Sequence, residues 1–593
     1  MRSSHRLHKK AELIPLLIVL ILFGVLIFRL FFLQVVRAQT YRRLSEENRI
    51  RVIPVDAPRG HILDRHGQVL VCNRPSYVVS IVPFKLRQME QTIETLSGFL
   101  GMESGSIITR LNESRQRRFE PVKIKRDIDF KTLAIIQEHK LDVPGVIYQV
   151  EPRREYLYGD LAAHLLGTVG EISSEELAGL RSAGYRHGSL IGKGGLEKLY
   201  ERFLRGEDGV QYVEVSAVGR EIGPLPDRPA VEAKPGNDLV LTIDLSLQQA
   251  AEEALSDSAA GAIVALDPAS GEILAMVSRP AFDPNLFSSV IPESTWRALN
   301  EDPGHPLLNR AIQSAYPPGS ILKVLTAAAG LEAGVITEHT RFSPCTGAFK
   351  YGDRWFGCWQ SWGHGSLALV DALAQSCDVY FYQLGLKVGL DRWSDFVKRC
   401  GLGKTFGVDL VGEVSGLVPD RQFFNDHYGR RNWGPGVLLN LAIGQGENLI
   451  TPLQTASLIA AVGSDGTIYK PHLVREIRSL TGKTLDQKSE VIGQLPVSAE
   501  HLKLLKRSMR AVVHHHMGTG RQAAVAGFEV AGKTGTAQNP HGEDHAWFAA
   551  FAPVEEPRIA VAVIVEQGGH GGSVAAPIAG RVMEAYLRGS GTQ

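Results

Sequence analysis

The clearest hydrophobic pattern lies at the N-terminus. No charged residue occurs from Leu13 to Phe28, and the apolar run continues from Leu30 to Val36 beyond the single Arg29. About 20 apolar residues span the hydrocarbon core of a bilayer, and an arginine near the end of such a span can reach the interface with its long side chain. Residues 13–36 are therefore predicted to form a transmembrane signal-anchor.

The flanks of this segment bear on its processing and orientation. A cleaved signal peptide is the alternative, but the apolar stretch exceeds a typical signal core, and the following VVRAQTY offers no small-x-small cleavage site. By the positive-inside rule, the basic residues before the span favour a cytoplasmic tail at residues 1–12, although Arg37, Arg42 and Arg43 weaken the count. We expect a single pass with the remaining chain outside. The basic residues are Arg2, Arg6, Lys9 and Lys10.

Residues 37–235 combine many charges with short alternating runs. IRVIPVDAP, SYVVSIVPF and GVIYQVEP are typical of strands, and SEELAGLRSAG is typical of a helix. We interpret this region as an extended, non-catalytic pedestal domain of mixed β and α structure.

Residues 236–593 form the second predicted domain, since 593 residues are too many for one ordinary core. It opens with a turn, a strand and a helix whose N-cap is Asp244 or Ser246. GAIVALDPASGEILAMVS predicts one hairpin, and AWFAAFAP with RIAVAVIVEQ predicts another. Helical patterns lie between the hairpins. The fold class is therefore α+β, with an antiparallel sheet covered by a helical subdomain.

The charge balance narrows the classes of partner. The chain has 64 Lys and Arg against 63 Asp and Glu, a formal net charge of +1. This balance gives no general electrostatic reason to bind nucleic acid.

The first candidate for chemistry is the sequence YPPGSILK, which contains Ser320 and Lys323. At the start of a helix, the i, i+3 spacing places the Ser320 hydroxyl and the Lys323 amine on one face. A deprotonated lysine can activate a serine nucleophile, and free N–H groups at a helix N-terminus can hold an oxyanion. About one or two S-x-x-K matches are expected by chance in a chain this long, so the motif alone is weak.

Two further motifs complete a possible site. Lys533, Thr534, Gly535 and Thr536 follow the strand-like GFEVAG and should lie on a sheet edge, where a cation and hydroxyl groups can bind a carboxylate. Ser376-Cys377-Asp378 lies inside a long helical pattern, where the Ser376 hydroxyl could relay a proton.

Together the three motifs resemble the penicilloyl-serine transferase superfamily, whose site is built from S-x-x-K, S-x-N or a variant, and K-T-G. PRGHILDRHG resembles the R-G-x-I-x-D-R-x-G segment of class B penicillin-binding proteins. YPPGS, the GHG at Gly363–Gly365 and SCD are similar to the elongation subgroup, penicillin-binding protein 2. The resemblance covers almost the whole chain, since AAHLLGTVGEI, GKGGLEKLYERFLRGEDG, NLAIGQGENLITPLQTA and VGSDGTIYKP match as well.

This resemblance implies a dimerisation-type pedestal and a penicillin-binding transpeptidase domain. It implies that Ser320 attacks the D-Ala-D-Ala amide of a peptidoglycan stem peptide, with Lys323 as general base and Ser376 as proton relay. Lys533, Thr534 and Thr536 would hold the terminal carboxylate, and the backbone N–H groups of Ser320 and Thr536 would form the oxyanion hole. An amine would resolve the acyl-enzyme, whereas β-lactams would stay on Ser320.

The same resemblance implies a setting and partners. The chain would cross-link peptidoglycan during cell elongation and shape maintenance, as a single-pass protein of the bacterial inner membrane whose catalytic domain is periplasmic. A SEDS-family glycan polymerase and shape-determining scaffold proteins would be its partners. No cofactor is required for catalysis.

Asp378 departs from the superfamily pattern, because most members have asparagine there. An amide both donates and accepts hydrogen bonds, whereas an ionised carboxylate only accepts them. The elongation subgroup is known for aspartate at this position, so Asp378 is interpreted as a subtype marker in the substrate site.

A second group of candidate residues consists of three cysteines and a histidine. Cys345, Cys358, His364 and Cys377 supply three thiols and one imidazole, a common closed set for structural zinc. A disulfide between Cys345 and Cys358 is the alternative outside the cytoplasm. Members of the elongation subgroup have been described with a metal near this place, which favours zinc.

The remaining candidate residues give weaker evidence for a functional site. His514, His515 and His516 point about 100° apart on a helix and so do not converge on one ion. Cys72 and Cys400 are interpreted as small hydrophobic side chains.

Three alternative functions are weighed against a transpeptidase. A bifunctional class A synthase would need a glycosyltransferase domain, but residues 41–235 contain no E-D-x-x-F-like motif. A D,D-carboxypeptidase or β-lactamase shares the Ser320 chemistry but transfers the acyl group to water, and the anchor and pedestal argue against it. A non-catalytic β-lactam sensor or scaffold would not need Ser320, Lys323 and Lys533 intact.

Overall fold

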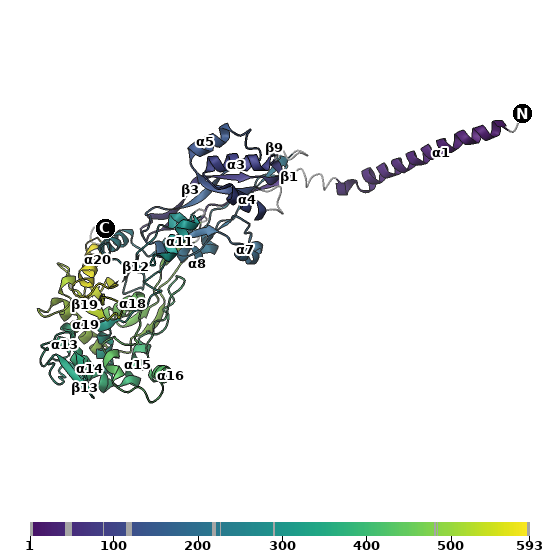
Figure 1. The fold of residues 1–593 in the computed structure, drawn as a ribbon. Helices are drawn as coiled ribbons and strands as arrows, with labels where there is room; N and C mark the ends of the chain where they lie inside the picture. The colour runs from purple at the N-terminus through teal and green to yellow at the C-terminus, as the bar shows by residue number, and fades with distance from the viewer. Residues whose placement is uncertain are drawn as a thin grey trace.

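The structure is a computed structural model in which an isolated helix is followed by an elongated body (Figure 1). Helix α1 (Ser4–Phe31) lies at one end, and the C-terminal helix α20 (Ala575–Gly589) packs within the body. The residues described are 4–41, 50–86, 88–113, 121–215, 221–225, 227–288, 291–479, 482 and 484–589.

Helix α1 continues into one π-helical turn, η1 (Phe32–Val36). Within the described part of the chain, Pro15–Val36 is the one helical segment long and apolar enough to cross a membrane, and none of it is buried. The prediction of an N-terminal apolar span is confirmed by this helix. A helix that faces lipid is expected to be apolar on all sides and to make no contact with the rest of the protein.

The pedestal is built around strands whose alternating residues pack against helices on one face. β3 is the longest of them and pairs along its length with β5, while β4 lies on its other side. The runs predicted as strands are found in β1, β3 and β5. The pedestal strands are β1 (Ile50–Val55), β2 (Ile62–Leu63), β3 (Val69–Ile81), β4 (Val122–Ile128), β5 (Val146–Tyr156), β6 (Val169–Glu171), β7 (Leu190–Gly192), β8 (Gly209–Val215) and β9 (Glu221–Pro224).

Short helices complete the pedestal. Ile93 and Leu96 of α3 pack with Ile124 of β4 in a separate core cluster. The predicted helix around SEELAGL is α7, which opens with a capping box between Ser173 and Glu176. The helical segments are η2 (Pro83–Lys85), α3 (Met89–Leu100), α4 (Ser104–Glu113), α5 (Phe130–Glu138), α6 (Ala163–Leu166), α7 (Ser174–Leu180), η3 (Arg181–Ala183), α8 (Gly195–Leu199) and α9 (Glu201–Leu204).

One sheet joins the two halves of the chain. Its order is β17-β16-β10-β2-β3-β4, and β10 (Asp238–Leu241) pairs in parallel with β2 and antiparallel with β16 (Val474–Arg478). β17 (Thr484–Asp486) forms its edge. The boundary between residues 235 and 236 stays a prediction, because residues on both sides of it share this sheet.

The C-terminal half is centred on a five-stranded antiparallel sheet with the order β12-β11-β21-β20-β19. Both predicted hairpins are present, β11–β12 and β20–β21. The three central strands are buried along almost their whole length, as expected for strands covered by helices on both faces. The strands are β11 (Gly261–Leu266), β12 (Ile273–Arg279), β19 (Ala531–Ala537), β20 (His545–Ala552) and β21 (Ile559–Val565).

Helices cover the two faces of this sheet. α10, whose N-cap is Asp244, packs with α20 on one face, and α18 and α19 pack on the other. A helical subdomain extends from that second face. The helices are α10 (Leu245–Ala254), η4 (Pro284–Phe287), α11 (Glu293–Glu301), η5 (Gly319–Leu322), α12 (Lys323–Glu332), α13 (Leu369–Ala374), α14 (Asp378–Val388), α15 (Leu390–Arg399), α16 (Arg421–Tyr428), α17 (Val437–Leu441), α18 (Pro452–Gly463), α19 (Ala499–His514) and η6 (Arg521–Ala523). Two small hairpins pair β13 (Ala348–Tyr351) with β14 (Arg354–Gly357) and β15 (Thr467–Tyr469) with β18 (Val491–Gln494).

A buried ion cluster lies where the pedestal approaches the second half. The Glu197 carboxylate is fully buried and accepts hydrogen bonds from Arg154 Nε at 2.6 Å and Arg59 Nη2 at 2.6 Å. Burial alone raises the pKa of Glu197, but the two guanidinium groups outweigh it and lower the pKa below its usual value. Arg59 belongs to the PRG segment, so this motif serves the junction of the fold.

Glu197→Ala is expected to lower the free energy of unfolding by about 3–5 kcal/mol, because it leaves two buried guanidinium groups without their shared carboxylate. Urea unfolding of the full chain in detergent measures the shift. The matched control is Glu201→Ala, which removes a more exposed carboxylate from Arg59 but leaves Glu197 in place. An equal loss in both variants would contradict this account.

Candidate active site

Ser320 lies at a tight turn fixed by backbone packing. Gly319 has a φ of +55°, and a Cβ there would lie 2.7 Å from the carbonyl oxygen of Thr536, so only glycine fits. The Gly319 N–H donates to the Gly444 carbonyl at 2.9 Å. Tyr316 pairs with Ile450 in a β-bridge at the start of the turn. The turn at Gly319 and Ser320 is therefore held between β19 and the chain after α17.

Ser320 and Lys323 lie on the same side of the helix start. The first turn, η5, is a 3₁₀-helix, in which residues three apart are eclipsed. The Lys323 side chain is fully buried, whereas Ser320 is partly exposed. Within the described residues, the Ser320 hydroxyl has no hydrogen-bond partner, and the residue is partly exposed to solvent.

The side-chain nitrogen of Lys323 has three oxygen partners. Nζ donates to Asp378 Oδ1 at 2.6 Å, to the Ser376 carbonyl at 2.8 Å and to Ser376 Oγ at 3.3 Å. Lys323 is thereby tied to Ser376 and to the start of α14.

Ser376 occupies a break between two helices. The sequence pattern predicts one long helix here, and this was wrong, because α13 ends at Ala374 and α14 begins at Asp378. Ser376 has a φ of +54°, a conformation that costs a non-glycine residue of the order of 1 kcal/mol or more. Contacts from two buried lysines hold it there. The break turns the Ser376 hydroxyl and carbonyl toward these lysines.

Lys533 is the second of those lysines. It lies on β19, an edge strand as predicted, and is fully buried. Its Nζ donates to Ser376 Oγ at 2.9 Å and to the Thr534 carbonyl at 3.1 Å. Burial, and next the positive charge of Lys323, lower the pKa of Lys533 well below its usual value. The Ser376 hydroxyl therefore bridges two lysine side chains.

The rest of β19 faces the nucleophile turn. The Thr536 carbonyl accepts from Gln445 Nε2 at 2.9 Å, and its hydroxyl is near the N–H of Gly571 at 3.5 Å. The N–H and C=O of one residue point to the same side of a strand, so the Thr536 N–H also points away from β20. A Cβ on Gly319 would lie 3.0 Å from that nitrogen. The N–H groups of Ser320 and Thr536 are thus close neighbours.

Thr534 and Gly535 make contacts within the protein. The Thr534 hydroxyl is bonded to that of Thr519 at 2.8 Å and is nearly buried. A Cβ at Gly535 would lie 2.9 Å from the Pro318 carbonyl. Gly535 therefore allows the close approach of β19 to the turn, and Thr536 is the more exposed of the two threonines.

The Asp378 carboxylate is bonded within the protein. Besides Lys323, it accepts from the backbone N–H of Trp359 through Oδ2 at 3.0 Å, and the residue is buried. Aspartate at this position thus ties Lys323 to the loop that carries Cys358.

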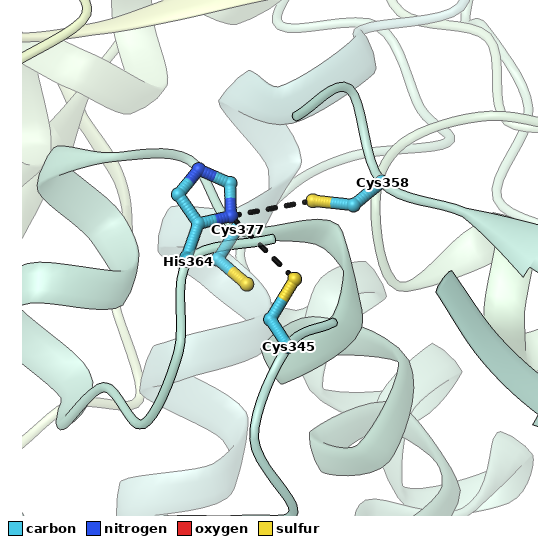
Figure 2. A group of neighbouring side chains, drawn as sticks. All are labelled: Cys345, Cys358, His364 and Cys377. Atoms are coloured by element: carbon cyan, nitrogen blue, oxygen red, sulfur yellow. Dashed lines mark hydrogen bonds between the residues drawn. The ribbon is translucent and has the colours of Figure 1, made fainter. Parts of the chain in front are cut away.

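Four thiol and imidazole groups converge beside this loop, as Figure 2 shows. Their ligand atoms all lie within 4.8 Å of one another. His364 Nδ1 is 3.6 Å from Cys345 Sγ and 3.5 Å from Cys358 Sγ. The cysteines are free, so the Cys345–Cys358 disulfide is not formed in this structure. The fourth member is Cys377, next to Ser376.

The remaining sequence candidates lie elsewhere. His514 accepts the backbone N–H of Val530, and His515 accepts that of Met517, so each has a local partner. Cys400 is buried, whereas Cys72 is half-buried near Glu155.

The sequence pattern did not single out Gln445, Thr519 or Trp359. Gln445 occurs in NLAIGQGENL, a segment noted only for its family resemblance. Gly444 and Gly446 flank Gln445 in this segment. Because glycine allows two backbones to approach closely, this pattern could have indicated that Gln445 contacts a backbone group.

Comparison with known proteins agrees with this geometry. Residues 261–584 match the model of the penicillin binding protein transpeptidase domain, and residues 54–241 match that of the penicillin-binding protein dimerisation domain. These two domains define a penicillin-binding protein. The chain belongs to class B of that family, in the penicillin-binding protein 2 group.

The relatives span the whole chain. The peptidoglycan D,D-transpeptidase MrdA of Haemophilus influenzae is 35% identical over 99% of this chain and 93% of its own length. MrdA of Escherichia coli K12 is also 35% identical, over 96% of this chain and 93% of its own.

Solved structures support the same group. The complex of penicillin-binding protein 2 and MreC from Helicobacter pylori gives a TM-score of 0.79 at 29% identity, covering 91% of this chain and 100% of the other. A structure described as a peptidoglycan synthase complex that coordinates polymerization and crosslinking gives a TM-score of 0.71 at 31% identity, covering 100% and 99%.

Proposed function

We propose that this chain is a peptidoglycan D,D-transpeptidase that cross-links stem peptides during cell elongation, through an acyl-enzyme on Ser320. The observation that carries the proposal is the convergence of Lys323, Lys533 and the strained Ser376 behind an accessible Ser320.

In the acylation step, Ser320 Oγ attacks the carbonyl carbon of the D-Ala-D-Ala amide. Lys323 takes the hydroxyl proton as the O–C bond forms, a step that requires its amine to have a free lone pair. The C–N bond then breaks, and the leaving amine of D-Ala takes up a proton. Ser376 Oγ, 3.3 Å from Lys323 Nζ, is placed to pass that proton on.

The negative charge that develops on the carbonyl oxygen is stabilised by two backbone donors. The N–H groups of Ser320 and Thr536 form this oxyanion hole, and they need no reorganisation because Gly319 and Gly444 lock the turn. The terminal carboxylate would bind at this edge of β19, where the Thr536 hydroxyl is partly exposed and Lys533 lies buried behind the strand. Thr534 and Gly535 shape this part of the substrate site from behind.

Asp378 acts by positioning Lys323. Its bond to Lys323 Nζ fixes the amine behind Ser376, and its second oxygen is held by Trp359. In the deacylation step, an amine of a second stem peptide attacks the ester carbonyl, transfers its proton and releases Ser320. A β-lactam opens its ring on Ser320 but keeps its leaving amine attached, so the adduct persists.

The nature of the acceptor separates this function from that of a carboxypeptidase or β-lactamase. The test incubates the full chain with a donor pentapeptide ending in D-Ala-D-Ala and with an amino-acid amine acceptor. We expect the new amide in addition to released D-Ala, with the amide fraction rising with acceptor concentration. Hydrolysis product alone, at every acceptor concentration, would contradict a transpeptidase.

The N-terminal span supplies the location. We infer a cytoplasmic tail at residues 1–12, a transmembrane anchor at 13–36, the pedestal at 37–235 and the transpeptidase domain at 236–593. The basic residues before the span favour a single-pass inner-membrane protein with a periplasmic catalytic domain. Its likeness to structures described with MreC and as a polymerization and crosslinking complex supports a scaffold protein and a SEDS-family glycan polymerase as partners.

Zinc fits the cysteine cluster, although catalysis needs no cofactor. In a tetrahedral zinc site, bonds of 2.3 Å to sulfur and about 2.0 Å to nitrogen place S and N about 3.5 Å apart. The distances from His364 Nδ1 to two thiols are 3.5 Å and 3.6 Å. His364 Nε2 is buried without a partner among the described residues, which leaves Nδ1 as the ligand atom. The ion would be structural, holding Cys377 and thereby the helix break at Ser376.

We predict about one zinc per chain in the purified protein, and less than about a third of that in Cys345→Ser, because a three-ligand site binds far more weakly. Metal analysis by mass spectrometry measures the content. Cys72→Ser, which changes a cysteine of the pedestal, is the control and should keep its zinc. Absence of zinc together with two thiols protected as a disulfide would contradict the site.

A further inference from the structure

One short segment after α17 is bonded to both parts of the proposed oxyanion hole. The Gly444 carbonyl accepts the N–H of Gly319, the residue before Ser320, at 2.9 Å. The next side chain, Gln445, reaches the outer edge of β19, where its Nε2 donates to the Thr536 carbonyl at 2.9 Å. Two adjacent residues of one segment are therefore bonded next to the two proposed N–H donors.

The Gln445 carboxamide pairs with β19 as a peptide group of a further strand would. Besides its bond to Thr536, its Oε1 accepts the N–H of Gln538, directly after the strand, at 3.3 Å. β19 is an edge strand, and the outward N–H and C=O groups of an edge strand lack partners from the sheet. A carbonyl only accepts and an N–H only donates, so both bonds require a side chain that ends in a donor and an acceptor.

Direct contact between β19 and the turn at Gly319 and Ser320 consists of packing. Gly319 lies against Thr536, and Gly535 lies against the Pro318 carbonyl. Within the described residues, no hydrogen bond joins residues 317–320 to β19 directly, although Trp547 of β20 donates to a carbonyl of the turn at 3.1 Å. A packing contact has little directional preference, whereas a hydrogen bond favours one distance and direction. The segment at 444–445 therefore supplies the directional link between β19 and the turn.

Buried contacts hold the backbone that carries Gln445. Asn448 is 1% exposed, and its Nδ2 donates to the Gln445 carbonyl at 3.2 Å. Two residues further on, Ile450 pairs with Tyr316 in a β-bridge at the start of the same turn. The position of the Gln445 backbone is therefore fixed relative to the turn, and its side chain extends from there to β19.

We propose that Gln445 is a positioning residue of the oxyanion hole, whose side chain sets the distance between the N–H of Ser320 on the turn and that of Thr536 on β19. This inference rests on the proposed function, in which those two groups stabilise the developing oxyanion. Preorganised donors are effective because they already point to the place that the oxyanion takes in the transition state. Gln445 acts through the two donors and not on the substrate.

The test measures acylation of the full chain in detergent by a fluorescent penicillin, with stopped-flow detection. The concentration dependence separates the dissociation constant of the noncovalent complex from the rate constant of acylation. Gln445→Ala should lower the rate constant about 10- to 10²-fold, because a displaced oxyanion donor is lost mainly in the transition state. The dissociation constant should change by less than about threefold, which also shows that the variant is folded.

Two further variants isolate the hydrogen bonds of Gln445. Gln445→Met keeps a side chain of similar length but has no strong donor or acceptor, so its rate constant should fall about as far as that of Gln445→Ala. Glu447→Ala is the matched control in the same segment, because the Glu447 carboxylate is bonded to Tyr428 instead of β19, and it should be acylated at the native rate.

The outcomes separate this inference from the proposed function. A native rate constant in Gln445→Ala or Gln445→Met would overturn the positioning role, as would a loss that appears in the dissociation constant. Faster acylation of Gln445→Ala would also overturn it, and would indicate that the side chain blocks the edge of β19. Absence of covalent labelling in the native chain would instead overturn the proposed function.

Discussion

Replacing Ser320 with alanine is expected to abolish covalent labelling by penicillin and to lower cross-linking by about 10⁴-fold or more, because no other group can form the acyl-enzyme. Ser320 is the partly exposed residue of a turn that packs against Thr536 of β19 and leads into the buried Lys323. The Gly319 and Gly444 contacts that shape this turn are made by backbone atoms, so the variant keeps the geometry of the site. Fluorescent penicillin labelling followed by gel electrophoresis measures the first effect.

The control for this variant is Ser366→Ala, which changes an exposed serine of the loop before α13. Its labelling should equal that of the native chain. Labelling of Ser320→Ala at the native level would show that another nucleophile reacts.

Replacing Lys323 with alanine is expected to lower the rate of acylation by about 10²- to 10⁴-fold, the range typical of a general base. Its Nζ is the amine that can receive the Ser320 proton, and it anchors both Ser376 and Asp378. The positive charge of Lys323 also contributes to the lowered pKa of Lys533. Its removal therefore moves the Lys533 pKa up toward the ordinary value. The rate constant for acylation by penicillin, measured by stopped-flow fluorescence, gives the effect.

Two further measurements separate the effect of Lys323→Ala on acylation from its effect on stability. Lys323→Ala leaves the Asp378 carboxylate buried without its cation, so its unfolding midpoint is measured beside the rate. Asp378→Asn keeps a hydrogen-bonding group next to Lys323 and should retain acylation within about tenfold, since one positioning bond is weakened. An acylation rate in Lys323→Ala within a few-fold of the native rate would contradict its role as base.

The sequence pattern was sufficient for the local features of the site. Ser320 and Lys323 were placed on one side of a helix start because a fixed spacing has a fixed geometry there. The edge position of Lys533 followed from strand patterns on either side of it. Cys345, Cys358, His364 and Cys377 were grouped by residue chemistry, because three thiols and an imidazole are a common zinc set, and a Cys345–Cys358 disulfide was the alternative.

Features that depend on distant contacts were not predictable in this way. At the helix break, Ser376 contacts Lys323 and Lys533, which lie far away in sequence, so the local apolar pattern gave no sign of it. The same is true of Asp378, whose bonds to Lys323 and Trp359 were not foreseen when it was assigned to the substrate. The pairing of β10 with β2 joins segments about 180 residues apart, and only the three-dimensional structure reveals it.

The measurement that tests the central claim most directly is peptide mapping of the full chain after reaction with penicillin. Tryptic cleavage after Arg310 and Lys323 yields the peptide of residues 311–323, which contains Ser314 and Ser320. Fragmentation of this peptide by tandem mass spectrometry locates the adduct. Our account predicts one penicilloyl group on Ser320, whereas an adduct on Ser314, on a residue outside this peptide, or on no residue would contradict it.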